Sequence, residues 1–176
     1  MEKSQAASTV EIRLITEDEA MDFWNLRLRG LKEDPEAFGA SYAESLNFAK
    51  EDILHRLSNS NNSFVFGAFN PHPVGILGFF RRPGERSRHK GSIWGVYVAP
   101  EARGIGLARQ LMIKGIERAK TLPDLDELIL TVSTTQEAAQ KLYLSLGFKE
   151  YGHEVNALKQ GDTYIDEKMM MLRLHD

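Results

Sequence analysis

Two glycines at the start of a helix-like segment are the residues whose spacing most directly suggests chemistry. An apolar stretch, residues 96–98, leads through a short connection into residues 103–108 (RGIGLA), and a long amphipathic segment follows. Because glycine has no Cβ, a ligand can approach the backbone closely at Gly104 and Gly106. The unpaired N–H groups of a helix N-terminus favour phosphate and other anions. The pattern therefore predicts a phosphate site beside a strand end, where Arg103 adds a positive charge.

Other interpretations of this glycine turn fit the sequence less well or are less specific. A dinucleotide-binding fingerprint requires a third Gly or Ala, whereas position 109 is Arg109, and Asp124, about twenty residues on, follows a helix rather than a strand. A P-loop requires Gly-Lys-Ser/Thr, which the sequence lacks. The two glycines could also serve only to let the strand and the helix pack tightly, and this structural role stays open.

A second motif follows about thirty residues later and carries a tyrosine. Residues 139–148 (AQKLYLSLGF) fit the pattern A-x-x-L-Y-x-x-x-G-F. The first motif resembles the Arg/Gln-x-x-Gly-x-Gly/Ala pyrophosphate loop of the GNAT N-acetyltransferases. The second is similar to this family's signature on the helix after the fifth strand. A predicted helix and a predicted strand separate the two motifs, as the family requires, and the resemblance covers roughly residues 10–174.

The periodicity of apolar residues predicts the elements that would position these motifs. We expect strands near residues 10–14, 64–69, 74–81, 92–98, 128–132, 148–158 and 163–174, and helices near 16–33, 50–57, 107–120 and 135–146. The order is β-α-α-β-β-β-α-β-α-β-β, an α/β fold with a mixed sheet. Residues 1–9 are expected to form a flexible tail and residues 10–176 a single domain. The resemblance implies the GNAT fold, in which acetyl-CoA binds between the fourth and fifth strands of a splayed sheet.

The resemblance implies transfer of an acetyl group from acetyl-CoA to a primary amine, by direct attack and a tetrahedral intermediate. The oxyanion that forms needs hydrogen-bond donors, which N–H groups of the fourth strand supply in the family. Gly95 in this strand is either a bulge residue or a space for a neighbouring side chain. The sequence has no cysteine that could carry the acetyl group. The residues expected to contact acetyl-CoA are Val96, Tyr97, Val98, Arg103, Gly104, Ile105, Gly106, Leu107, Ala108, Arg109, Gln136 and Tyr143.

By its place in the second motif, the resemblance implies that Tyr143 is the general acid for the departing thiolate. The alternative is a buried tyrosine whose hydroxyl bonds to the backbone. Gln136 stands where many relatives carry Asn, so its contact with the pantetheine arm or the acceptor departs from the family pattern. The 3′-phosphate of CoA is expected to meet Arg103, Arg109 or Lys141, and no spacing argument chooses among the three.

The base that removes the proton of the amine is not evident from the sequence. Many relatives place Glu early in the fourth strand, but residues 91–94 (GSIW) contain no carboxylate. The candidates elsewhere are Glu44, His153, Asp166 and Glu167, each of which is better explained as a surface group. Deprotonation at pH 7 costs roughly 4–5 kcal/mol for a lysine-like amine and about 1 kcal/mol for an α-amino group. The missing carboxylate therefore favours an amine of low pKa or a base that acts through water.

The acceptor is expected to be the amine of a small molecule, such as an amino acid, a polyamine or an aminoglycoside-like compound. Phe38, Tyr42 and Trp94 are the candidate lining of its pocket. The basic residues between Arg81 and Lys90 are either a solvated hairpin loop or an attraction for an anionic acceptor. A protein N-terminus or lysine is an alternative substrate. A CoA-binding regulatory module without catalysis is an alternative of a different class.

Composition excludes several further functions. The formal net charge of −3 gives no electrostatic support for nucleic-acid binding, and the absence of cysteine excludes disulfides. The histidines show no ligand spacing, so no metal is predicted.

No apolar run approaches 18 residues and residues 1–9 are polar, so we expect no membrane span, no secretory signal and a cytoplasmic location. Relatives are often dimers, so the resemblance raises a homodimer, although no sequence patch indicates one.

Overall fold

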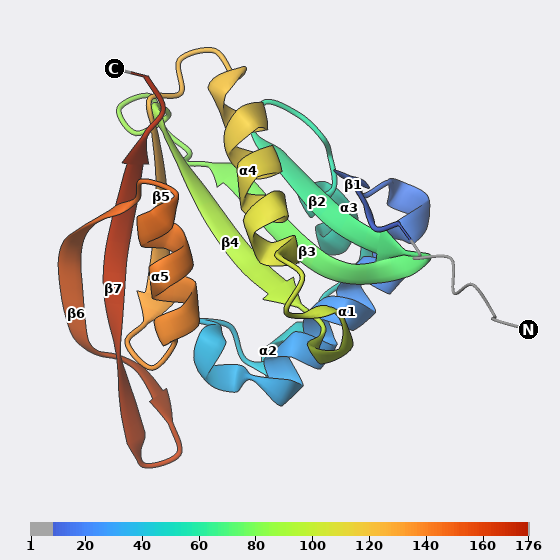
Figure 1. The fold of residues 1–176 in the computed structure, drawn as a ribbon, viewed down its shortest axis with the longest axis horizontal. Coiled ribbons are helices and arrows are strands. Elements are labelled where there is room, and N and C mark those ends of the chain that lie inside the picture. Colours follow the sequence, from blue (N-terminus) through green and yellow to red (C-terminus); the bar gives the residue numbers. More distant parts are fainter. Residues whose placement is uncertain (1–8, 176) are drawn as a thin grey trace, which may run out of the picture.

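The computed structural model describes residues 9–175, which form a seven-stranded mixed sheet with helices on both faces (Figure 1). The strands are β1 (Glu11–Leu14), β2 (Ser63–Asn70), β3 (His72–Arg81), β4 (Lys90–Val98), β5 (Glu127–Ser133), β6 (Lys149–Gln160) and β7 (Thr163–Arg173). The helices are α1 (Ala20–Glu33), α2 (Tyr42–Leu46), α3 (Lys50–Arg56), α4 (Leu107–Lys120) and α5 (Glu137–Ser145). The expected mixed α/β fold is confirmed. Of the expected tail, residues 1–8 lie outside the described part of the chain.

Helix α2 is the element that the apolar periodicity does not predict. It has only five residues and begins at a capping box, in which Glu44 N donates to Ser41 Oγ and Ser41 N donates to Glu44 Oε2. A helix this short leaves no periodic stripe, so the Ser-x-x-Glu spacing was its only sequence signal. The other helices follow the predicted ranges closely, although residues 17–19 form a 3₁₀ turn ahead of α1.

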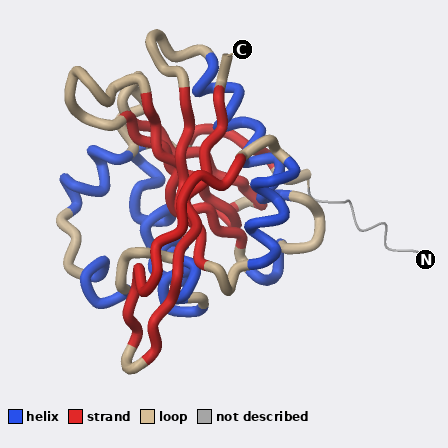
Figure 2. The backbone as a smooth tube through the Cα atoms, turned by 90° about the vertical axis from the view of Figure 1, so that its left-hand side faces the viewer, coloured by secondary structure: helices blue, strands red, loops and turns tan. Residues whose placement is uncertain are grey.

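The strand order is β1-β2-β3-β4-β5-β7-β6, and β4 and β5 are the parallel pair in it. Their pairing is short, since it joins only Lys90, Gly91 and Ser92 to residues 127–129. The rest of β4 continues along β3, whereas β5 pairs on its other side with β7 along its whole length. The two halves of the sheet therefore separate beyond residue 92. The β6–β7 hairpin extends past the other strands (Figure 2).

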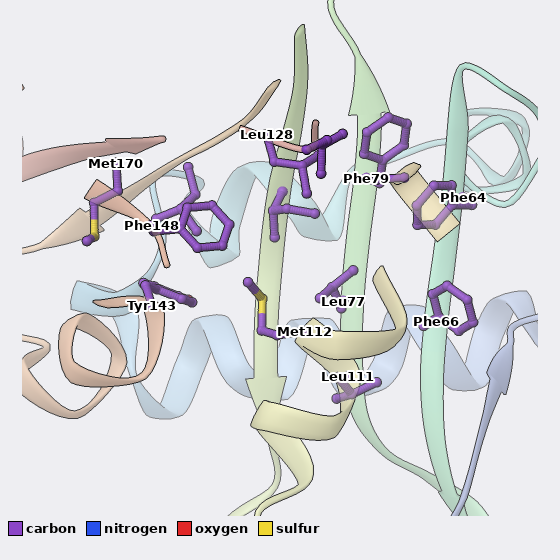
Figure 3. Packing of buried hydrophobic residues seen from close by; sticks show 14 of the residues in the cluster. Phe64, Phe66, Leu77, Phe79, Leu111, Met112, Leu128, Tyr143, Phe148 and Met170 are labelled. Carbon is purple, nitrogen blue, oxygen red and sulfur yellow. The ribbon is translucent and has the colours of Figure 1, made fainter. Parts of the chain in front are cut away.

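Two apolar clusters cover the opposite faces of the sheet. Helices α4 and α5 pack on one face against Phe79, Leu128 and Phe148 (Figure 3). Helices α1 and α3 pack on the other face, which includes Ile76 and Tyr97. The alternation of side chains along each strand divides the core in this way. Both faces of the central strands are covered, which explains the nearly continuous apolar sequence of β2 and β3.

Gly95 is a bulge residue in β4. Gly78 pairs with Trp94 and Ile76 pairs with Tyr97, so two residues of β4 oppose Leu77 of β3. The φ angle of Gly95 is +63°, in the left-handed region that favours glycine. A Cβ at this position would also lie only 2.7 Å from Nη1 of Arg27. The expected bulge at Gly95 is confirmed, and the alternative that Gly95 only makes room for a neighbouring side chain is wrong, although the residue does that as well.

Arg81 corrects the interpretation of the basic segment 81–90 as a solvated loop. This arginine is buried at the end of β3, and its guanidinium donates to four carbonyl oxygens, those of Asn61, Arg88, Pro123 and Asp124. The sequence shows charge but not burial, so Arg81 could not be told from its exposed neighbours Arg82 and Arg86. These hydrogen bonds of Arg81 hold the β3–β4 connection against the loop before β5.

Candidate active site

A cavity of about 290 Å³ lies where β4 and β5 separate. Its walls come from β4, β5, α4, α5 and the loop that follows α1. The lining residues are Asp34, Ala37, Val96, Tyr97, Val98, Arg103, Ala108, Thr131, Val132, Gln136, Ala138, Ala139, Leu142 and Tyr143. The cavity thus brings together the strand, the glycine turn and the tyrosine motif that the sequence singles out.

The glycine turn forms the N-terminal end of α4 beside this cavity. Gly104 and Gly106 have φ angles of +83° and +79°, and a Cβ at either position would have no atom within 4 Å among residues 9–175. The turn therefore needs glycine for its backbone conformation and leaves open space above it. Tight packing of strand against helix is wrong as an explanation of these glycines.

The backbone N–H groups at this helix end are available for a ligand. The first helical bond runs from Gln110 N to Gly106 O, so the N–H groups of residues 107–109 precede it. Arg103 lines the cavity, and its Nε donates to Val98 O over 2.8 Å, which fixes the turn to the end of β4. Arg109 is held away from the turn by a bond from Nη1 to Ser145 Oγ. The side chain of Leu107 is buried in the core, whereas that of Ile105 is exposed.

Val96, Tyr97 and Val98 present one edge of β4 to the cavity. The side chain of Tyr97 extends to the opposite face of the sheet, where its hydroxyl donates to Glu33 Oε2 over 2.8 Å. Burial and this bond raise the pKa of Tyr97 to about 12. The side chain of Tyr97 is therefore held by its hydrogen bond to Glu33, and the backbone of Tyr97 is the part that a ligand could contact.

Tyr143 lies on α5 with 7 % of its surface exposed, and it lines the cavity. Within residues 9–175 its hydroxyl makes no hydrogen bond, so the alternative of a backbone-bonded tyrosine is wrong. Burial raises the pKa of Tyr143 to about 12, and the hydroxyl stays protonated at neutral pH. It is a hydrogen-bond donor without an acceptor in the described structure.

Gln136 is the residue before α5, and its Nε2 donates to Asp34 Oδ1 over 3.1 Å. Asp34 follows α1 directly and is the one carboxylate among the residues that line the cavity. In the sequence Asp34 stands before Pro35, a step that ends helices, and it is not among the site residues expected from the motifs. A second bond, from Thr135 Oγ1 to Glu36 Oε2, ties the same two segments together.

The base candidates chosen from the sequence lie elsewhere. Glu44 belongs to the capping box of α2, and His153 pairs with Asp166 over 2.9 Å on the β6–β7 hairpin. Glu167 is partly buried on β7, where desolvation and the nearby Glu154 raise its pKa. None of the four lines the 290 Å³ cavity.

The three aromatic residues expected around the acceptor do not share one pocket. Phe38 and Tyr42 line a cavity of about 300 Å³ between the α1–α2 loop and the β6–β7 hairpin. Trp94 lines a separate cavity of about 790 Å³ between α3 and the β3–β4 pair. Phe38 also packs against Tyr97 of β4, with the ring centroids 6.2 Å apart.

Two absences concern the described residues alone. Residues 9–175 contain no group of three or more His, Cys, Asp or Glu side chains that could hold a metal ion. None of their helices is long and apolar enough to cross a membrane.

Known proteins support the assignment that this geometry suggests. Residues 26–148 match the sequence model of the Acetyltransferase (GNAT) family. Spermidine N(1)-acetyltransferase of Vibrio cholerae is 31% identical over 84 residues, which are 48% of this chain and 49% of that protein. L-2,4-diaminobutyric acid acetyltransferase of the same organism is 31% identical over 103 residues, 58% of this chain and 55% of that protein. The chain thus spans about half the length of these relatives.

Solved structures share the fold at low sequence identity. An acetyltransferase of the GNAT family from Streptococcus pneumoniae superimposes with a TM-score of 0.83 and 24% identity, over 94% of this chain and 99% of that one. The protein yncA from Salmonella typhimurium, solved with its cofactor acetyl-CoA, superimposes with a TM-score of 0.82 and 19% sequence identity, over 96% of each chain. The family match covers most of the chain, and this protein belongs to the GNAT acetyltransferase family.

Proposed function

We propose that this protein is an N-acetyltransferase that uses acetyl-CoA to acetylate the primary amine of a small molecule. The observation that carries the proposal is the unpaired hydroxyl of Tyr143 in a cavity that also receives the glycine turn of α4 and the free edge of β4. These three parts supply what acyl transfer requires, namely a phosphate site, donors for an oxyanion and a donor for the leaving group. The names of the relatives that act on spermidine and diaminobutyric acid support a small amine.

The α4 N-terminus would hold the pyrophosphate of CoA. A Cβ at Gly104 or Gly106 would meet no described atom within 4 Å, so the turn is open, and the helix dipole favours an anion at this end of α4. Arg103 adds a positive charge at the same turn. The edge of β4 at residues 96–98, which the bulge at Gly95 and the divergence from β5 leave open, would pair with the pantetheine arm.

Asp34 is the group placed to take the proton of the acceptor amine. It is the carboxylate that lines the cavity, and only its Oδ1 is used in the hydrogen bond with Gln136. An ammonium acceptor first gives one proton to this carboxylate, and the neutral amine nitrogen then attacks the thioester carbon. The nitrogen loses a second proton as the tetrahedral intermediate collapses to the amide. N–H groups of residues 96–98 hold the oxyanion that forms.

Tyr143 would stabilise the sulfur as the C–S bond breaks. A thiol has a pKa near 8.5, so complete transfer from a hydroxyl of pKa about 12 is uphill by roughly 5 kcal/mol. The hydroxyl therefore acts as a hydrogen-bond donor to the thiolate, and the second proton lost by the nitrogen neutralises the thiolate, while the first remains with Asp34 until it passes to solvent. The products are the N-acetyl amine and CoA.

The test is release of free CoA from acetyl-CoA in the presence of small amines, amino acids and peptides. We expect release with small amines and its loss by at least about 100-fold in Tyr143→Phe. Tyr151→Phe is the matched control, because Tyr151 is exposed on β6 and remote from the cavity. Release with peptides alone would replace the small-molecule acceptor by a protein. Binding of CoA with no release for any amine would leave a CoA-binding module.

A further inference from the structure

Arg27, in the middle of α1, is a buried cation without a counter-charge. Only 8 % of the residue is exposed, and Nε and Nη1 are enclosed with no hydrogen-bond partner. Within residues 9–175 no carboxylate forms an ion pair with this guanidinium. Desolvation and the charge of Arg56 lower its pKa to about 10, so the group is still charged at neutral pH. Buried charges in proteins are normally paired, and this one is not.

Aromatic rings surround Arg27 and offer its N–H groups only weak acceptors. The guanidinium carbon lies 4.9 Å from the ring of Trp94, 5.7 Å from Trp24 and 5.8 Å from Phe38. Arg56 lies 5.1 Å from the same Trp94 ring, so two arginines flank one indole. The cation–π contacts offset part of the desolvation free energy of Arg27, but the N–H groups of its planar guanidinium make no hydrogen bonds with residues 9–175. That planar group matches the geometry of a carboxylate or a related oxyanion.

Arg27 lies close to the proposed reaction site, although it lines neither the 290 Å³ nor the 790 Å³ cavity itself. Its Nη1 lies against Gly95, the bulge residue that directly precedes the cavity-lining Val96. On the other side, Trp94 and Arg56 line the 790 Å³ cavity, which could admit a small molecule. Asp34 comes seven residues after Arg27 and directly follows the last residue of α1, which places it roughly 10 Å further along the chain direction of the helix. A cation in α1 and a carboxylate just after its end therefore lie near the same part of β4.

We propose that the acceptor carries an oxyanion, such as a carboxylate, in addition to its amine, and that Arg27 binds this group with Arg56 at the rim. The inference rests on the proposed acetyltransferase function, since it names the class of acceptor. The amine lies toward Asp34 and the oxyanion toward Arg27, so the site complements an amino-acid-like zwitterion. A polyamine is a poor fit, because two arginines would repel it. Asp52, also in the lining of this cavity, lies near Arg56 but forms no ion pair with it.

Binding can be tested separately from turnover. Trp24 and Trp94 both contact Arg27, so their fluorescence should report an oxyanion bound there. The probes are the straight-chain amino acids from glycine to 6-aminohexanoate, glutamate and the primary amide of each, titrated in the presence of CoA. We expect at least one acid to bind at least tenfold more tightly than its amide. Arg27→Gln should remove that difference without changing the affinity for CoA.

Two further variants secure the comparison. Arg56→Gln changes the rim and should reduce the preference for acids even if Arg27→Gln folds poorly. Arg173→Gln, an exposed arginine of β7, is the matched control and should bind as the unmodified protein does. Equal binding of acids and amides, or no response to any acid of the series, would overturn the inference.

CoA release measured with the same compounds separates the two proposals. Selective binding of an acid with no acetylation of any amine would refute the acetyltransferase and keep the oxyanion site. Acetylation of amides or polyamines as efficiently as acids would refute the oxyanion site and keep the acetyltransferase.

Discussion

The side chain of Gln136 donates a hydrogen bond to Asp34 across the opening between the two halves of the sheet. Gln136 belongs to the β5–α5 side, whereas Asp34 closes α1, which packs against β3 and β4. The bond therefore joins segments that the divergence of β4 and β5 would otherwise leave apart. It also holds the carboxylate of Asp34 in the cavity.

Asp34→Asn and Gln136→Ala separate these two roles. Gln136→Ala removes about 1 kcal/mol of hydrogen bonding, so we expect kcat/KM to fall by about fivefold. Asp34→Asn also removes the carboxylate, and loss of a general base lowers the rate by about 100-fold or more. The measurement is kcat/KM for the acceptor at saturating acetyl-CoA. Equal effects of the two variants would show that Asp34 only positions Gln136.

Tyr143→Phe should lower kcat by about 100-fold or more and leave the KM for acetyl-CoA nearly unchanged, because the lost donor acts on the leaving sulfur. Its pKa of about 12, raised from 10 by burial, keeps the hydroxyl protonated across pH 6 to 10. The ratio of the two rates should therefore stay constant over that range. A ratio that falls toward one above pH 8 would mean that Tyr143 ionises in the active enzyme.

The fold was predictable because its strands and longer helices leave strong local patterns. The apolar runs of β2, β3 and β5 and the stripe of α4 mark their elements directly. Helix α2 was missed, because one turn and a half leaves only a cap. The short pairing of β4 with β5 leaves no local signal at all, since it depends on where two distant strands meet.

The site was predictable where backbone chemistry determines residue type. Glycine at 104 and 106 follows from positive φ angles, and the same reason explains Gly95. Asp34 and Arg27 were missed because the roles proposed for them depend on tertiary position. In the sequence Arg27 is an ordinary charged residue of a helix and Asp34 an ordinary residue at a helix end, and only packing shows that Asp34 faces the cavity and that Arg27 is buried without a partner.

Gly106→Ala tests the phosphate site, and Gly161→Ala is its control, because alanine should strain the backbone by a similar free energy at both positions. Gly106 and Gly161 both have positive φ angles, and a Cβ at either meets nothing within 4 Å in the described structure. Each Ala variant should therefore lose about 1–2 kcal/mol of stability. Only Gly106→Ala should also raise the KM for acetyl-CoA, by roughly 10-fold or more, through a disturbed N–H contact to a charged group. A similar KM change in both would place the effect in general stability.

Arg27 and Arg81 are equally buried, at 8 % exposure, yet substitution by Met should change stability in opposite directions. Arg81 donates to four carbonyl oxygens, and its loss leaves them without partners. Arg81→Met should lower the free energy of unfolding by about 2–4 kcal/mol. Arg27 has no hydrogen bond to lose, so Arg27→Met removes an unpaired buried charge and should raise that free energy by about 1–3 kcal/mol.

Denaturant unfolding of the two variants, without ligand, measures both effects. A residue that binds a ligand can lower the stability of the protein without that ligand, because active sites keep groups that folding alone would not favour. Destabilisation by Arg27→Met of the size expected for Arg81→Met would mean that the aromatic contacts of Arg27 already compensate its burial. The oxyanion would then no longer be needed to explain why this arginine is there.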